Sequence, residues 1–322
     1  MTLLLPPPTS VHRDGPDRPT PTYYEQPALK PSPWGWMVSG YMSIAGLAGS
    51  AQILATAADL AGGGHYNAIV RNGRYLALAG TVIGGPLLIA DLHTPQRFYN
   101  MLRIFRPTSP MSIGTYVLLG FASCSAVLAA AQLRRDAGMG YGVVQTAARL
   151  LELPAAALGA AMGTYTGALL GATSTPLWAA APRLIPALFG SSAVASAASA
   201  LSLVASPEEA AVLERIELLA STGELALMSG LHRQWHAKGI KTKPAFAPLL
   251  LTAAAPWLRK AVPAITYPSP TRQPAAPQPA RGRLVVAVAA LAGAFLLRHA
   301  ILRAGNHSAQ RPRDYFRLAQ RR

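Results

Sequence analysis

Long apolar segments are the feature of this sequence that most restricts its fold. An α-helix needs about 20 apolar residues to cross the ~30 Å hydrocarbon core of a bilayer. Eight segments approach that pattern, of which the last two are the weaker. Their approximate bounds are 36–60, 75–92, 111–133, 147–172, 179–205, 212–231, 245–258 and 284–302. We therefore predict an all-α integral membrane protein with about eight transmembrane helices. Segment 245–258 is short and contains two prolines, so a re-entrant segment is the alternative there.

Charge content and its distribution support the same class. Only 13% of the residues are charged, against roughly 25% in soluble domains. The net charge of +16 comes from Lys and Arg in loops and tails between apolar blocks, which is typical of membrane proteins. The expected partner is therefore a lipid bilayer and not nucleic acid. The single cysteine, Cys124, excludes an iron–sulfur cluster of the chain's own, because such clusters need about four thiolates.

The sequence divides into two tails and a helical region. Residues 1–33 form a Pro-rich arm, residues 263–280 a Pro-rich connector, and residues 304–322 a basic tail. An even number of spans places both ends of the helical region on one membrane face, which we call the terminal face. We call the opposite membrane face the far face. Polar and aromatic residues converge on the terminal face: Trp34, Trp36, Tyr41, Asp91, His93, Tyr165, Thr166, His232 and His236. Lys and Arg are more numerous there too, which favours a cytoplasmic terminal face.

The segment GGPLLIADLHTPQRFYNMLRIFRPTSPM, residues 84–111, joins the second and third spans. Asp91 and His93 stand where the second helix leaves the apolar region. The following connector is basic and aromatic, with apolar residues at helical spacing. We interpret it as a docking surface for a partner protein, with a helix lying in the membrane interface as the alternative. The candidate docking residues are Arg97, Phe98, Met101, Arg103 and Arg106.

Carboxylates inside the spans are a further candidate for function. Glu152, Glu217 and Glu224 lie within predicted helices, where ionisable groups are costly and often functional. Glu152 and Glu224 are candidates for a proton path, and pairing with a neighbouring Arg or Ser is the alternative. Gly159, Gly163, Gly167 and Gly171 recur every four residues, which predicts a helix face that a neighbour approaches closely.

Four passages resemble one membrane-protein family. They are PSPWGWMVSGYMSIAGLAGSAQ, GGPLLIADLHTPQRFYNMLRIFRPTSPMS, YTGALLGATSTPLW and, more weakly, RIELLASTGELALM. Over residues 25–235 the chain is similar to the NrfD-type membrane subunits of polysulfide reductases. The resemblance implies two four-helix bundles, 34–172 with a quinone site and 173–303. It also implies no redox cofactor in this chain, a ferredoxin-like iron–sulfur partner, and usually a molybdopterin catalytic subunit. In the best-known members the partner-facing surface is outside the cytoplasm, which opposes the charge distribution.

The resemblance also suggests where a quinone binds. Family members have a tyrosine and an acidic residue near the quinone head group, at places that match Tyr165 and Asp91. Quinone chemistry needs hydrogen-bond donors and a titratable group, which a phenol and a carboxyl supply. His93 and Trp36 are further candidates. The alternatives are a capping or Arg97-paired Asp91, a solvated His93, and interfacial anchors at Tyr165 and Trp36.

We therefore predict a multi-pass subunit in the cell membrane that exchanges electrons and protons between quinone and an iron–sulfur partner, as in anaerobic respiration. Whether the chain is itself a quinol-oxidising enzyme or a non-catalytic subunit stays open. The main alternative is a structural anchor for a reductase, without quinone chemistry. A transporter is a third possibility. Haem between histidines is the rival cofactor, but the histidines lie near helix ends and the family lacks haem. We expect no metal site.

Overall fold

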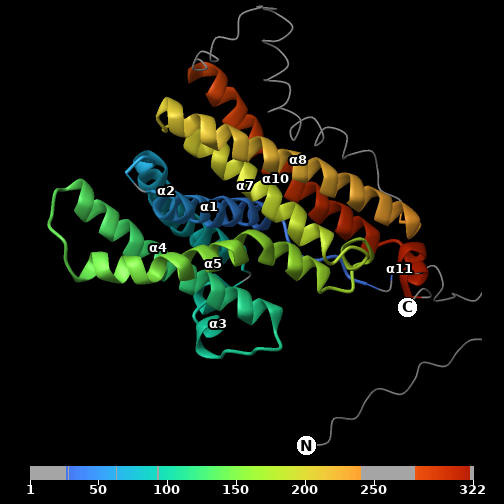
Figure 1. Cartoon of the computed structure of the whole chain (residues 1–322). Coiled ribbons are helices and arrows are strands. Elements are labelled where there is room, and N and C mark those ends of the chain that lie inside the picture. The colour runs from blue at the N-terminus through green and yellow to red at the C-terminus, as the bar shows by residue number, and fades with distance from the viewer. Residues whose placement is uncertain (1–26, 28, 63, 93, 241–279, 320–322) are drawn as a thin grey trace, which may run out of the picture.

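A computed structural model describes residues 27, 29–62, 64–92, 94–240 and 280–319. Within that part of the chain every regular element is a helix (Figure 1). The long helices are α1 (Trp36–Leu60), α2 (Asn67–Ala90), α4 (Pro110–Asp136), α5 (Val143–Gly171), α7 (Leu184–Ser202), α8 (Pro207–Ala237) and α10 (Ala280–Ala309). The short ones are a 3-10 turn (Pro95–Arg97), α3 (Asn100–Arg103), α6 (Pro176–Ala179) and α11 (Pro312–Ala319).

Six of these helices are long and apolar enough to cross a membrane: α1, α2, α4, α5, α7 and α10. The predicted span 212–231 lies within α8, which does not meet that criterion. The predicted span 245–258 and nearly all of the connector 263–280 lie outside the described residues, as does most of the arm 1–33. The described chain is thus an all-helical membrane protein with six candidate spans.

Helix α1 is the centre of the packing. It packs against α2, α5, α7 and α10, while α4 lies against α2 and α5, and α8 lies against α7 (Figure 1). The first four long helices therefore form one connected group, and α7, α8 and α10 a second. The two groups share extensive contacts, because α1 and α5 both pack against α7 and α1 also packs against α10.

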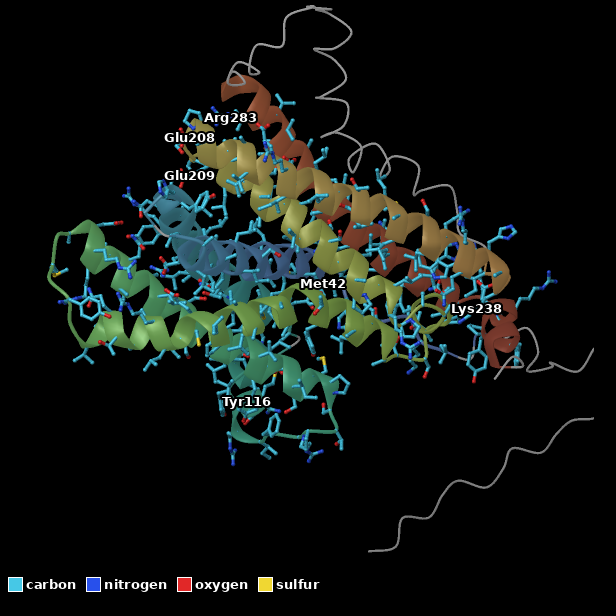
Figure 2. The ribbon with its side chains drawn as sticks, in the orientation of Figure 1. Met42, Tyr116, Glu208, Glu209, Lys238 and Arg283 are labelled. Atoms are coloured by element: carbon cyan, nitrogen blue, oxygen red, sulfur yellow. The ribbon has the colours of Figure 1, made fainter. Side chains whose placement is uncertain are left out.

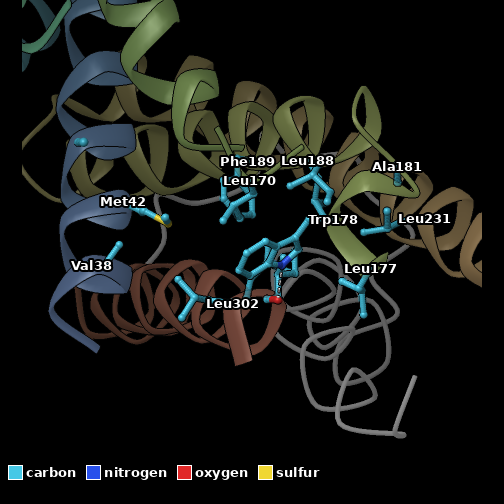
Figure 3. Close-up of a cluster of buried hydrophobic side chains, with 14 of the residues drawn as sticks. Val38, Met42, Leu170, Leu177, Trp178, Ala181, Leu188, Phe189, Leu231 and Leu302 are labelled. Atoms are coloured by element: carbon cyan, nitrogen blue, oxygen red, sulfur yellow. Dashed lines mark hydrogen bonds between the residues drawn. The ribbon is translucent and has the colours of Figure 1, made fainter. Parts of the chain in front are cut away.

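The two ends of the described chain meet, which agrees with the prediction that both lie at one membrane face. The backbone N–H and the hydroxyl of Ser32 both donate to Asn306 Oδ1, at 2.9 and 2.8 Å. Trp34 stacks on Trp178, with 6.0 Å between ring centroids. Trp178 is fully buried and donates from Nε1 to the carbonyl of Ile301 (Figure 3). This apolar cluster therefore holds the two ends of the described chain together at the terminal face.

Proline and glycine mark many of the helix ends. Pro110, Pro176 and Pro207 each occupy a first helical position, where the missing N–H costs nothing. Gly138 and Gly239 follow the ends of α4 and α8 with φ of 69° and 71°, a conformation that glycine adopts without strain. The local sequence therefore accounts for these boundaries.

The glycine face of α5 makes the predicted close contacts, but with more than one neighbour. Gly159 meets the backbone of Gly49 in α1, and Gly167 meets Ile185 and Pro186 in α7. Gly171 meets Pro182 in the segment before α7. Helix α5 therefore holds the two groups of helices together.

Glu209 joins the far ends of α2 and α8. Its Oε1 accepts hydrogen bonds from the N–H groups of Ala68 and Ile69, at 2.8 and 3.2 Å, and its Oε2 accepts one from Ser206 N–H. Burial alone would raise the pKa of Glu209, but the hydrogen bonds from Ser206, Ile69 and Ala68 outweigh it and lower the pKa. This carboxylate thus caps α2 from another helix, outside the six candidate spans (Figure 2).

We expect Glu209→Ala to destabilise the protein by about 1–2 kcal/mol, the usual cost of a lost helix cap. Because the folded state lowers this pKa, the stabilisation is complete above the ordinary carboxyl pKa and is lost as the pH falls through the lowered value. Thermal unfolding of wild type and variant at neutral and acidic pH measures this difference. The control is Glu208→Ala, an exposed neighbour in the same helical turn. Equal unfolding temperatures for the two variants at neutral pH would contradict the assignment.

Candidate functional site

Tyr165 of α5 reaches across to the start of α4. Its hydroxyl donates to the carbonyl of Pro110 at 2.5 Å. Its ring occupies the space beside Gly114, where any side chain would collide with it. The predicted site residue is therefore held at the terminal end of α4 by a hydrogen bond and a glycine.

Tyr41 of α1 is the group that the structure brings beside Tyr165. The two phenols are close enough to interact electrostatically, and Tyr41 is only 6% exposed. The Tyr41 ring lies next to Gly84 of α2. Each tyrosine thus lies against a glycine of a neighbouring helix, Gly84 for Tyr41 and Gly114 for Tyr165, so all four helices of the first group contribute. The sequence placed Tyr41 on the correct face but did not identify it as a site residue.

Asp91 lies nearer to the membrane surface than this tyrosine pair. It is the residue that ends α2, it is half-buried, and its N–H donates to the Leu87 carbonyl. It follows Gly84 by seven residues, about 10 Å along the helix axis. Asp91 and the tyrosines therefore share the terminal end of the first group at different depths. His93 lies outside the described residues.

The tryptophan candidates separate into two roles. Trp36 begins α1 and is 61% exposed, as an interfacial residue would be. Trp34 instead packs on Trp178 in the buried cluster. Trp34 therefore belongs to the buried packing, in the same hydrophobic cluster as Tyr41, whereas Trp36 faces outward.

The connector between α2 and α4 is not one amphipathic helix. It consists of the turn Pro95–Arg97 and the four-residue helix α3, and it projects from the body of the protein (Figure 1). Of the predicted docking residues, Met101 is half-buried and the others are exposed, namely Arg97, Phe98, Arg103 and Arg106. Tyr99, Ile104 and Phe105 are more than half exposed as well. The connector therefore exposes basic and apolar side chains, as the docking prediction needs, although it does not form the continuous helix that the spacing suggested.

Glu152 is part of a buried charge network near the far face. Arg74 of α2 is fully buried and forms an ion pair with Glu152 of α5. The same guanidinium donates to Asp59 of α1 at 2.8 Å and to Gln132 of α4 at 3.0 Å. One side chain from each of the four helices meets here. For Glu152 the geometry thus favours the alternative of pairing with an arginine.

Glu224 is buried in the second group of helices. It interacts with Ser192 of α7 by a hydrogen bond and with the fully buried Arg298 of α10 by charge. Glu217, two turns away, accepts a hydrogen bond from Ser199 at 3.0 Å. Both carboxyls therefore have partners on neighbouring helices.

The described histidines are scattered. His65, His232 and His236 are exposed, and His299 Nδ1 lies 3.2 Å from the Ser39 hydroxyl. Among the residues that the structure describes, no cluster of three or more His, Cys, Asp or Glu side chains is arranged to hold a metal ion. The described part therefore offers no geometric argument for haem or a metal.

Residues 26–308 match the family model described as "Polysulphide reductase, NrfD". Among curated proteins, none matches the chain. Subunits of this family associate with iron–sulfur and molybdopterin subunits. The match spans most of the chain, and six helices can cross a membrane. The protein therefore belongs to the NrfD polysulphide reductase family and is a multi-pass membrane subunit of an oxidoreductase.

Proposed function

We propose that the chain passes electrons and protons between the quinone pool and an iron–sulfur partner in the cell membrane. The observation that best supports this proposal is the placement of Tyr41 against Gly84 and of Tyr165 against Gly114. This placement concentrates phenolic donors at the terminal end of the first four helices. Asp91 ends α2 at the same face, and the exposed connector begins there.

Each group has a chemical task in this proposal. Quinol oxidation releases two electrons and two protons. Phenols can donate hydrogen bonds to the quinone oxygens, and a carboxylate at the membrane surface can accept a released proton. Tyr165, or Tyr41 beside it, would hold the head group, and Asp91 would exchange protons with the solution. Glycines at 84 and 114 leave room for the tyrosine rings.

The electrons then leave for partner subunits. We propose that quinone binds as an exchangeable substrate, with no covalently bound cofactor in this chain, and that the iron–sulfur clusters and molybdopterin belong to partners. The exposed connector, with Arg97, Arg103 and Arg106 beside aromatic side chains, would dock the ferredoxin-like subunit. Interfaces of this kind are enriched in Arg and aromatic residues.

A structural anchor is the competing function. The observation that favours it is the hydrogen bond from Tyr165 to the Pro110 carbonyl, which a purely structural tyrosine would also make. An anchor would bind no quinone. The two functions therefore differ in a measurable property of the isolated chain.

We expect Tyr165→Phe and Asp91→Asn each to weaken binding of a menaquinol analogue by at least about tenfold, which equals ~1.4 kcal/mol. Tyr165→Phe removes a phenolic hydrogen-bond donor, and Asp91→Asn removes the charge of the carboxylate, while both preserve shape. Saturable quenching of tryptophan fluorescence in detergent-solubilised full chain measures the affinity. The control is Tyr75→Phe, a tyrosine near the far face that donates to Asp136.

Unchanged affinity in both variants would remove these residues from the site. Absence of saturable binding by a folded wild-type chain would support the anchor. Weakened binding in Tyr75→Phe as well would show a general loss of structure. An absorption spectrum of the same sample, without haem bands, is expected if the redox groups belong to partners.

A further inference from the structure

The interface between α7 and α8 is unusually polar for two packed helices in a membrane protein. Helix α8 carries Glu217 and Glu224, which are 0% and 6% exposed, with the buried Ser221 between them. Seven residues separate the carboxyls, so both lie on one helix face about 10 Å apart. Helix α7 presents four buried serines: Ser192, Ser196, Ser199 and Ser202. We call these seven residues the seam.

Two serines of α7 connect to the two carboxyls of α8. The Ser199 hydroxyl donates to Glu217 Oε1 at 3.0 Å, and the Ser192 hydroxyl interacts with Glu224. At the far face, Arg283 of α10 donates to the Ser202 carbonyl at 3.1 Å. Figure 2 shows Arg283, Glu208 and Glu209 at this end of the protein and Lys238 at the other. The seam therefore runs inward from the far face.

Helix adhesion alone does not require carboxyls at these positions. Serines already give interhelical hydrogen bonds in a membrane, each with a modest contribution. An ionisable group there adds a large desolvation cost. Two buried carboxyls two turns apart, with serine hydroxyls alongside them, are instead an arrangement that can relay protons. Hydroxyl groups one turn apart are separated by ~5 Å, a gap that a bridging water spans.

Arg298 stands at the inner end of the seam. It is fully buried, and its guanidinium donates to the carbonyls of Phe189 and Ala294, at 2.8 and 3.0 Å. It also fills the space beside Gly46 of α1 and interacts with Glu224 by charge. A fixed positive charge in a narrow path repels protons. A proton that moves from Glu224 toward the terminal face would therefore meet the repulsion of Arg298.

We propose that the seam is a proton-access path that connects the far-face solution to Glu224 and is closed toward the terminal face by Arg298. A proton from solution binds the Glu217 carboxylate, which then releases it to a serine or water oxygen. Each oxygen that gains a proton passes one on, and the Glu224 carboxylate takes up the last. One proton enters for each carboxylate neutralised, and no oxidant or reductant is needed. This path does not depend on the quinone proposal.

One-sided acidification of proteoliposomes tests the path. Dicyclohexylcarbodiimide modifies protonated carboxyls in apolar surroundings, so the rate of Glu224 modification, read by mass spectrometry, reports its protonation. The full chain is reconstituted in one orientation, established by protease cleavage of the C-terminal tail, in sodium-free buffer with the membrane potential clamped. We expect acidification at the far face to raise the rate several-fold, and acidification at the terminal face to leave it unchanged. A rate that follows the terminal face, or neither face, would overturn the proposal.

Substitutions locate the path within the seam. Glu217→Gln should slow the response of Glu224 to far-face acidification several-fold, whereas Glu208→Gln, on the exposed side of the same helix, should not. If Glu217→Gln does not fold, Ser199→Ala removes the hydroxyl that donates to Glu217 and should slow the response in the same way. An undiminished response in the folded variant would overturn the assignment of the seam. Quinol binding is not measured, so failure here is distinct from failure of the quinone site.

Discussion

Replacement of Arg74 by Ala should lower the free energy of unfolding by about 3–5 kcal/mol, the usual cost of removing one partner from a buried ion pair. Arg74 is fully buried and donates to side chains of three other helices. Its loss leaves the Glu152 carboxylate, 9% exposed, without the cation that compensates its burial. Thermal unfolding in detergent, followed by circular dichroism, should show a decrease in Tm on the order of 10 °C.

A neighbouring arginine provides the matched control. Arg71 lies one turn from Arg74 on α2 and pairs with Asp136, but its side chain is 57% exposed. Exposed ion pairs contribute about 0–1 kcal/mol, so Arg71→Ala should hardly change the Tm. The double variant Arg74→Gln with Glu152→Gln should recover much of the stability, because no unpaired charge remains at Glu152. Equal effects of Arg71→Ala and Arg74→Ala would show that burial of the ion pair is unimportant.

Arg74 also shows which part of the fold could not be predicted from the sequence. Apolar length predicts the six candidate spans, and segment 36–60 matches α1 at both ends, but the predicted span 212–231 falls in α8, which is not a candidate span. The second span, however, was predicted from Tyr75, because a cationic residue lowers local hydropathy. The structure begins α2 at Asn67 and buries Arg74, since Asp59, Gln132 and Glu152 arrive from other helices. Such compensation depends on tertiary packing and leaves no local pattern.

In the candidate site, too, some features could be predicted from the sequence and others could not. Helix alternation alone places Asp91, Tyr165 and Tyr41 on one face. The positions of the Tyr41 and Tyr165 rings depend on which way each ring turns, and the space left by glycines on α2 and α4 decides this. The connector spacing predicted a helix, but only a turn and four helical residues form. Exposed side chains on a short connector provide little burial to offset the entropy of ordering it.

The glycine face of α5 leads to the second large effect, because α5 holds both groups of helices. A Cβ at Gly159 would lie 2.5 Å from the carbonyl oxygen of Gly49 and 3.3 Å from its Cα. Both are backbone atoms, so no side chain can move aside, and α1 and α5 would have to separate. We expect Gly159→Ala to destabilise the protein by about 3 kcal/mol, the upper range for overpacking. The Tm of the detergent-solubilised protein, compared with that of the wild type, measures this loss.

Gly163 distinguishes this steric effect from a general intolerance of alanine on α5. It lies one turn from Gly159 on the same face, and a Cβ there would meet Ala193 and Ser50 at 3.9 Å, an ordinary contact distance. Alanine also restricts the unfolded chain more than glycine does, so Gly163→Ala should be neutral or slightly stabilising. Opposite responses one turn apart would establish that α1 and α5 meet backbone to backbone at Gly49. Helix propensity favours alanine over glycine, so equal destabilisation of the two variants would need another cause, such as lipid contact, and the close approach of α1 to α5 would be wrong.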